Sequence, residues 1–126
     1  MKKIYIIEDE FDVSNLYRML FEREGIPVKR IVSNGVDALE DINKMSDELE
    51  DIVFLIDNRI PEETGLNIAK SLIELDPRMK DQIIIATADD TVTLDDIKAL
   101  GIKHFLRKPF ALEKLLEKIE EIQKSE

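Results

Sequence analysis

Four polar residues with complementary chemistry each stand at the end of a short apolar segment. They are Asp9, Asp57, Thr87 and Lys108. Carboxylates bind hard metal ions, a hydroxyl donates hydrogen bonds to an oxyanion, and a lysine ammonium neutralises negative charge. If they lie together, these groups suit the transfer of a phosphoryl group onto a carboxylate.

The acidic residues form the first part of this candidate site. Glu8, Asp9 and Asp57 would place three carboxylates at the ends of two strands, where like charges raise each other's pKa values unless a cation intervenes. The chain has no cysteine and one histidine, so the available ligands are oxygens. Oxygen ligands in an open, watery site favour Mg²⁺ over Ca²⁺, and the backbone carbonyl of Arg59 is a further candidate ligand.

Each of these residues also has an ordinary structural explanation. Glu8 and Asp9 can equally be acidic residues that stabilise a helix start. A threonine at a strand end often reflects strand propensity alone, and a lysine before proline is usually a solvated charge. Asp57 is harder to explain in this way, because it follows five apolar residues and an unpaired carboxylate beside a buried strand is costly. The conjunction of all four residues favours a functional site.

The segments that precede these residues are typical of buried parallel strands, since they are short, apolar and rich in β-branched residues. They cover residues 4–7, 52–56, 83–86 and 104–106, and a further strand is predicted at 28–32. Helical spacing appears between them, for example at Val13, Leu16, Tyr17, Leu20 and Phe21. Later helices are predicted to start near Gly65, near Thr93 and at Phe110. Five alternations of strand and helix predict an α/β fold with a parallel sheet and helices on both faces. The carboxyl ends of its strands would share one edge, where ligands gather in such sheets.

Composition restricts the class of protein. A chain of 126 residues suits a single domain. Its net charge of -10 argues against binding to nucleic acid or to an anionic membrane. No stretch resembles a signal peptide or a membrane span, and the absence of cysteine fits a reducing cytoplasm.

Several motifs follow one another along almost the whole chain. They are Ile7-Glu8-Asp9-Glu10, residues 57–65, Ala86-Thr87-Ala88, Ala99-Leu100-Gly101 and residues 105–110. In this order and spacing they closely resemble the receiver domain of two-component response regulators. The resemblance implies one receiver domain over residues 1–126, with a flavodoxin-like (βα)5 fold and strand order 2-1-3-4-5.

The resemblance also implies a role for each site residue. Asp57 would accept a phosphoryl group from the phosphohistidine of a partner kinase. Mg²⁺ would be held by Asp9, Asp57 and the Arg59 carbonyl, with Glu8 acting through water. Lys108 would neutralise the developing charge, and the domain would assist its own phosphorylation and dephosphorylation without being an enzyme in its own right.

The same resemblance implies a conformational switch. The hydroxyl of Thr87 would move towards the phosphoryl group and the ring of Phe105 would turn inward, which repacks the surface of the fourth helix, fifth strand and fifth helix. The Lys108-Pro109 peptide bond would be cis.

Four further residues need comment beside the common pattern. Glu8 stands where aspartate is frequent, which lengthens the side chain and favours contact with the metal through water. Arg59 and Asp89 flank the expected phosphoryl site and are candidates for an ion pair that restricts water. His104 is expected at the surface and not as a relay histidine.

The interpretation is therefore a stand-alone response regulator in phosphorelay signal transduction. Its partners would be a histidine kinase or histidine phosphotransfer protein and a downstream target protein, and it would be a monomer or weak dimer. A phosphorylation-independent scaffold and an isolated fragment of a longer regulator are the alternatives. A phosphatase of the haloacid dehalogenase type is disfavoured because Arg59 stands where its second aspartate belongs, and a flavin carrier because acidic residues follow the first strand.

Overall fold

Five strands and five α-helices alternate along residues 1–124, the part of the chain that the computed structural model describes. The strands are β1 (Lys3–Ile7), β2 (Val28–Val32), β3 (Ile52–Ile56), β4 (Ile83–Thr87) and β5 (His104–Arg107). The helices are α1 (Phe11–Arg23), α2 (Gly35–Lys44), α3 (Gly65–Leu75), α4 (Leu94–Ala99) and α5 (Leu112–Lys124). Short 3-10 helices at Leu49–Asp51 and Pro77–Asp81 precede β3 and β4.

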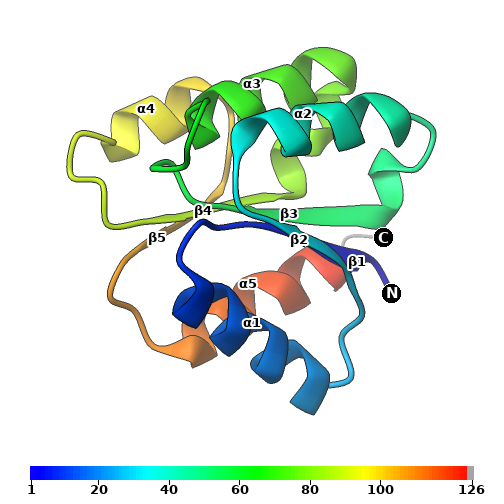
Figure 1. The fold of residues 1–126 in the computed structure, drawn as a ribbon, viewed down its shortest axis with the longest axis vertical. Helices are drawn as coiled ribbons and strands as arrows, with labels where there is room; N and C mark the ends of the chain where they lie inside the picture. Colours follow the sequence, from blue (N-terminus) through cyan, green and yellow to red (C-terminus); the bar gives the residue numbers. More distant parts are fainter. Residues whose placement is uncertain (125–126) are drawn as a thin grey trace.

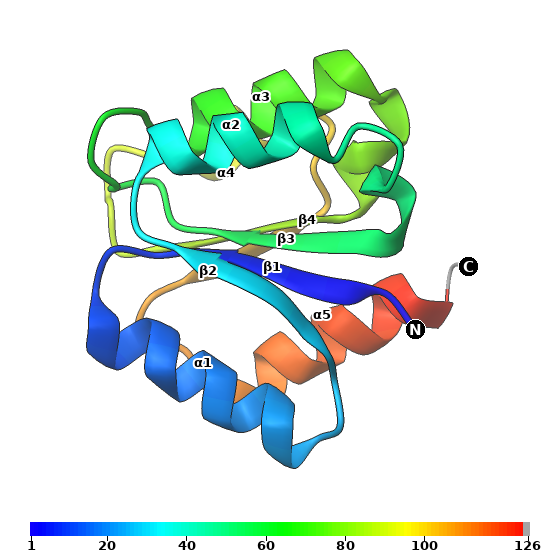
Figure 2. The same cartoon turned by 45° about the vertical axis from the view of Figure 1, so that its right-hand side comes forward.

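The five strands form one parallel sheet in the order β2-β1-β3-β4-β5. Helices α2, α3 and α4 cover one face, and α1 and α5 cover the other (Figures 1 and 2). The predicted flavodoxin-like fold and its strand order 2-1-3-4-5 are confirmed. None of the helices within residues 1–124 is long and apolar enough to cross a membrane.

Strand β3 is apolar along its whole length, and β4 is apolar up to Thr87, because both faces of these central strands are covered. Side chains alternate between the two faces, so Phe54 and Ile56 join the core under α2, α3 and α4, whereas Val53 and Leu55 join the core above α1 and α5. Every residue of β3 and β4 is buried. The two continuous apolar runs therefore lie in the middle of the sheet, as their composition predicts.

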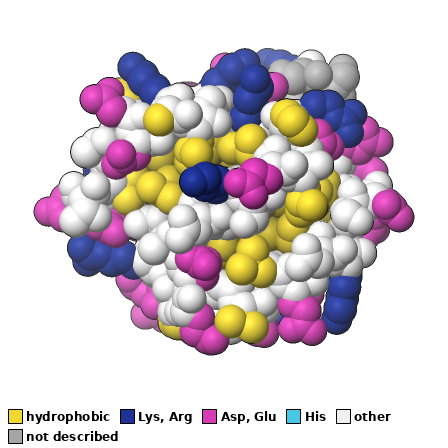
Figure 3. Space-filling model, turned by 90° about the horizontal axis from the view of Figure 1, so that it is seen from above, with side chains coloured by type: hydrophobic (Ala, Val, Ile, Leu, Met, Phe, Trp, Pro, Cys, Tyr) yellow, Lys and Arg dark blue, Asp and Glu magenta, His cyan; other side chains and the backbone are white. Residues whose placement is uncertain are grey.

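Polar side chains begin three of the helices. Asn34, Thr64 and Thr93 each accept a hydrogen bond from a backbone N–H in the first turn of α2, α3 and α4. Figure 3 shows the outer side of this helix layer, where hydrophobic side chains gather around a few charged ones. Exposed hydrophobic residues of these helices include Val36 and Leu94.

Two details of the helix prediction are wrong. Helix α5 begins at Leu112 and not at Phe110: the chain bends at Lys108 and Pro109, and the first backbone hydrogen bond of the helix runs from the Lys114 N–H to the Ala111 carbonyl at 2.9 Å. Leu16 is 47% exposed although its spacing matches the apolar face of α1. The buried face of α1 is carried by Tyr17, Leu20 and Phe21, and Leu16 lies at its margin.

Candidate functional site

The register of the sheet brings the predicted site residues to one edge. Ile7 of β1 pairs with Ile56 of β3, so Glu8 and Asp57 follow at the same level. The Asp57 N–H donates to the Ile7 carbonyl at 3.0 Å. On the other side, Lys108 follows β5 and its N–H donates to the carbonyl of Thr87 at 3.0 Å. Four strands therefore deliver their terminal side chains to a common edge, as the parallel topology requires.

Lys108 joins the two buried carboxylates of this edge. Its Nζ donates to Glu8 Oε2 at 2.6 Å and to Asp57 Oδ2 at 2.9 Å. The three side chains are 15%, 1% and 8% exposed, respectively. Bonds between a cation and two acceptors in such a water-poor place are shorter and stronger than neutral ones.

Burial and charge act in opposite directions on these groups. Burial raises the pKa of Glu8 to about 7, although hydrogen bonding to Lys108 lowers it. Burial also lowers the pKa of Lys108, but its hydrogen bonds to Glu8 and Asp57 outweigh this and raise that pKa above its ordinary value. Lys108 is thus held as an ammonium ion beside Asp57.

The loop after β3 folds back onto Asp57. The Arg59 N–H donates to Asp57 Oδ1 at 3.2 Å, and the Gly65 N–H donates to the Asn58 carbonyl at 3.0 Å. A Cβ atom at Gly65 would lie 2.2 Å from the carbonyl oxygen of Asp57. Only glycine allows this approach, so Gly65 fixes the position of the Asp57 backbone.

The oxygen donors at this edge fit a hard divalent cation such as Mg²⁺. Carboxylate oxygens of Glu8, Asp9 and Glu10 all lie within 4.8 Å of one another, and Asp9 and Glu10 are exposed. Asp57 lies outside this cluster of carboxylates, with its own carboxylate bonded to Lys108. Glu10, which sequence reasoning did not single out, donates its N–H to Glu8 Oε1 at 3.2 Å.

Thr87 ends β4, and Phe105 lies in the adjacent strand β5. Thr87 is fully buried, and its Oγ1 accepts a hydrogen bond from the Asp89 N–H at 3.1 Å. Phe105 is half-buried and packs against the core beneath α2, α3 and α4. The Lys108–Pro109 peptide bond is cis.

Asp89 bonds to several side chains, of which the sequence predicted only Arg59. Its pairing with Arg59 is present, with Nη2 at 3.4 Å from Oδ1. Its carboxylate also accepts from the Thr91 hydroxyl at 2.6 Å and from Asn58 Nδ2 at 2.9 Å. These bonds, the one from Thr91 first, hold the pKa of Asp89 well below its usual range. Asn58 is buried and carries no sequence signal beyond its place next to Asp57.

His104 contradicts the expectation of a surface residue. It is 6% exposed, because the first position of β5 points its ring beneath α5. Its Nδ1 lies 3.9 Å from Glu121 Oε2 and has no hydrogen-bond partner. Burial lowers the pKa of the imidazole, while the charge of Glu121 raises it. Strand β5 has only four residues, so its alternation of polar and apolar residues is too short to predict this burial.

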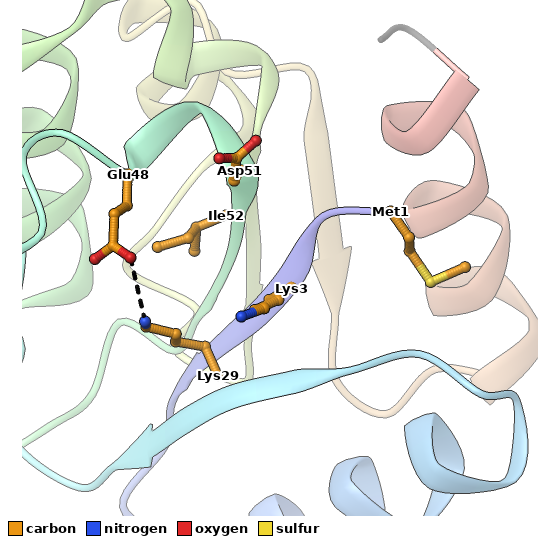
Figure 4. Close-up of a pocket in the computed structure, with 6 residues that line it drawn as sticks. All are labelled: Met1, Lys3, Lys29, Glu48, Asp51 and Ile52. Atoms are coloured by element: carbon orange, nitrogen blue, oxygen red, sulfur yellow. Dashed lines mark ion pairs between the residues drawn. The ribbon is translucent and has the colours of Figure 1, made fainter.

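A pocket of a different kind lies at the opposite edge of the sheet (Figure 4). It has a volume of about 200 Å³ and includes Lys3, Lys29, Glu48 and Asp51 in its lining. Lys29 and Glu48 form an ion pair of 3.6 Å, with side chains 30% and 56% exposed. Its charges are solvated, and none of the predicted site residues lines it.

Known proteins resemble this chain over nearly its full length. A family model described as the response regulator receiver domain matches residues 4–120. The chemotaxis protein CheY of Thermotoga maritima is 25% identical over 98% of both chains. The sporulation initiation phosphotransferase F of Bacillus subtilis is 30% identical over 90% of this chain and 87% of its own.

Solved structures give the same picture of the fold. A response regulator receiver domain protein from Clostridium thermocellum superposes with a TM-score of 0.82, at 24% identity over 99% of this chain and 96% of its own. The CheX-CheY-BeF3-Mg+2 complex from Borrelia burgdorferi contains a chain with a TM-score of 0.79, at 18% identity over 97% of this chain and 89% of that one. The observed fold is shared with both.

Proposed function

Because the chain belongs to the response regulator receiver domain family, we propose that it accepts a phosphoryl group on Asp57 from a phosphohistidine. The observation that carries this proposal is the partly buried ammonium of Lys108, 2.9 Å from Asp57 Oδ2 at the carboxyl end of the central strand. A nucleophilic carboxylate needs such a fixed cation, since negative charge accumulates on the phosphoryl oxygens during transfer.

In the proposed reaction, a carboxylate oxygen of Asp57 forms a new bond to phosphorus. The bond from phosphorus to the imidazole nitrogen of the donor breaks, and the imidazole leaves with the bonding electrons. Lys108 neutralises charge on the incoming group. Gly65 and the Arg59 N–H hold Asp57 in place, which keeps the carboxylate oriented for in-line attack.

Receiver domains are in general dependent on Mg²⁺, and a solved relative carries it together with BeF3. In this chain Asp9, Asp57 and the Arg59 carbonyl would hold the ion, and Glu8 would act through water. When bound, Mg²⁺ supplies positive charge to the phosphoryl oxygens. The exposed carboxylate of Asp9 beside the buried one of Glu8 supports this assignment.

The proposed response to phosphorylation is a change at the surface of α4, β5 and α5. Thr87 would move its hydroxyl towards the phosphoryl group and Phe105 would turn inward. The hydroxyl oxygen of Thr87 is now bonded to Asp89, so the movement has to alter the loop that follows β4. A downstream protein would read the new surface.

We place this reaction in the cytoplasm, with a histidine kinase or histidine phosphotransfer protein as donor and a protein target as output. The chain would act as a monomer or weak dimer. One relative is named a chemotaxis protein and another a sporulation initiation phosphotransferase, so the proposed output is control of chemotaxis or onward transfer of the phosphoryl group. The ion pair of the partly buried Lys108 with the buried Asp57 disfavours a scaffold that works without phosphorylation, because a scaffold has no use for this costly arrangement.

Intact-mass analysis after incubation with acetyl phosphate tests the proposal. We expect one phosphoryl group on the wild-type chain with Mg²⁺, none after chelation of the metal, and none on Asp57→Asn. Asp51→Asn is the matched control, because Asp51 lines the pocket at the opposite edge of the sheet. A wild-type chain that gains no phosphoryl group, or an Asp57→Asn variant that gains one, contradicts the proposal.

A further inference from the structure

The loop between β4 and α4, residues 88–93, is held from two sides. On the side of β3, Asn58 and Arg59 bond to the carboxylate of Asp89. On the side of β5, the guanidinium of Arg107 donates to the carbonyl oxygens of Asp89, at 2.6 Å, and of Val92. Asp89 is therefore bonded through its side chain to one neighbour and through its backbone to the other.

Arg107 also contacts Phe105. Its Cζ atom lies 4.9 Å from the centroid of the Phe105 ring. The two residues are two positions apart in β5, so their side chains leave the same face of the sheet. One guanidinium thus touches both the ring and the loop. Lysine cannot replace it, because a single ammonium lacks the planar fork that reaches two carbonyls and stacks on a ring.

The same loop residue fixes the hydroxyl of Thr87. The Asp89 N–H donates to Thr87 Oγ1 while the Asp89 carbonyl accepts from Arg107. A shift of the Thr87 oxygen towards Asp57 must break the first bond or carry the loop along and disturb the second. An inward turn of Phe105 would remove the ring from beneath the guanidinium. The proposed movements of Thr87 and Phe105 would therefore both break contacts that Arg107 makes in this structure.

From these contacts we propose that Arg107 is a positioning residue that holds the 88–93 loop in its resting conformation and so opposes the switch. This inference rests on the proposed function at Asp57. Arg107 favours the resting state only by contacts that the switched state lacks, so its removal should shift the balance towards the switched state. The two bonds from a charged donor lead us to expect a shift of about tenfold.

Hydrogen exchange of backbone amides is the first arm of the test, and it requires no phosphoryl chemistry. The variants are Arg107→Met, which keeps an unbranched stem, and Arg107→Lys, which keeps the charge. Arg23→Met is the matched control, because Arg23 is an exposed arginine of α1 whose ion pair is with the adjacent Glu24. We expect exchange in residues 88–93 to rise about tenfold in Arg107→Met, to rise in Arg107→Lys, and to stay unchanged in Arg23→Met.

Binding of BeF3 with Mg²⁺ is the second arm, since a receiver of the same fold has been solved in its BeF3-activated form. We expect Arg107→Met to bind BeF3 about tenfold more tightly than the wild type, because less of the binding energy is used to release the loop. Lost packing alone would weaken binding. Tighter binding of BeF3 together with faster amide exchange of residues 88–93 in Arg107→Met is therefore expected only if Arg107 opposes the switch.

The outcomes separate the two proposals. Unchanged exchange of residues 88–93 in Arg107→Met overturns the role of Arg107, as does weaker BeF3 binding. A wild-type chain that does not bind BeF3 overturns the proposed function at Asp57, while the exchange arm still reports on the loop. If Arg107→Met does not fold, Arg107→Lys gives the same comparison, and its failure to speed loop exchange overturns the inference.

Discussion

The two edges of the sheet carry the same kinds of charged side chain but differ in burial. At the carboxyl edge, Lys108 bonds to Glu8 at 2.6 Å and to Asp57 at 2.9 Å, and its side chain is 15% exposed. At the amino edge, Lys29 lies 3.6 Å from Glu48, and these side chains are 30% and 56% exposed. Exposed pairs contribute little to stability, whereas buried ones act strongly on each other. Burial of convergent charges distinguishes the proposed site from ordinary surface charge.

The difference follows from the topology. Each strand of the carboxyl edge ends in a loop that leads to a helix on one face or the other, which leaves a crevice where terminal side chains converge. At the amino edge the short 3-10 helix Leu49–Asp51 and the start of β1 form a shallow pocket. Equivalent substitutions at the two edges should therefore have unequal effects.

The largest effect is expected from Lys108→Met. We predict that phosphorylation by acetyl phosphate slows by a factor of about 100 or more, because the fixed cation beside Asp57 is lost. The rate of phosphoryl incorporation, followed by intact mass, measures this. Lys29→Met is the matched variant at the amino edge and should keep the wild-type rate. Equal rates for Lys108→Met and the wild type would show that the Lys108 ammonium has no part in the transfer.

Gly65→Ala should affect stability as well as the site. The new Cβ would meet the Asp57 carbonyl oxygen at 2.2 Å, so the loop has to shift, at a cost of about 2 kcal/mol or more in the free energy of unfolding. Gly25→Ala is the comparison, because Gly25 has a φ of +70° but nothing within 4 Å of a Cβ. It should cost about 1 kcal/mol through backbone strain alone. Urea unfolding measures both, and a larger loss for Gly25→Ala would contradict the packing argument.

Arg59→Ala should have a smaller effect, on the lifetime of the phosphorylated form. The ion pair of Arg59 and Asp89 lies beside the site, and Arg59 is 66% exposed, so we expect water to reach the phosphoryl group about two to five times faster without it. Decay of the phosphorylated mass after removal of acetyl phosphate gives the lifetime. Arg18→Ala, which loses an exposed ion pair with Glu22 on α1, is the control. An unchanged lifetime would rule out the screening role of Arg59.

The smallest effect is expected at His104, which tests what burial of a titratable group does away from the site. Burial lowers the pKa of its imidazole, and the nearby charges of Lys118 and Lys103 lower it further. The charges of Glu121 and Asp81 act in the opposite direction and raise it. The unfolded chain then binds a proton more readily, so stability is full above the ordinary value of about 6.5 and falls as the pH drops through the lower folded value.

His104→Leu removes this proton, so its stability should fall less than that of the wild type between pH 7.5 and 5.5. Urea midpoints at the two pH values provide the comparison. A steeper fall in the variant would show that His104 is more easily protonated in the folded chain than in the unfolded one.

Local sequence patterns predicted most of the fold, because apolar runs and helical spacing report directly on burial. The strand at 28–32 and the runs at 52–56 and 83–86 appear where they were expected. The weak pattern around His104 was misread, since a strand of four residues offers little alternation. The start of α5 was misplaced by two residues, because a chain leaving Pro109 can turn before its helix begins.

The candidate site divides in the same way. Strand ends could be predicted, so Glu8, Asp57 and Lys108 were expected at one edge, and the structure brings them into contact. The bonds of Asn58 and Arg107 to Asp89 were not foreseen. They depend on how two loops approach each other across the sheet, and neither residue type nor spacing encodes that approach.

Reduction with borohydride tests the central claim most directly, because it converts an aspartyl phosphate into homoserine and marks the modified residue. After incubation of the wild-type chain with acetyl phosphate and Mg²⁺, we predict homoserine at position 57 alone in the peptide mass spectra. Conversion at Asp9, at Asp51 or at any other carboxylate in place of Asp57 would contradict the account, as would the absence of any converted residue.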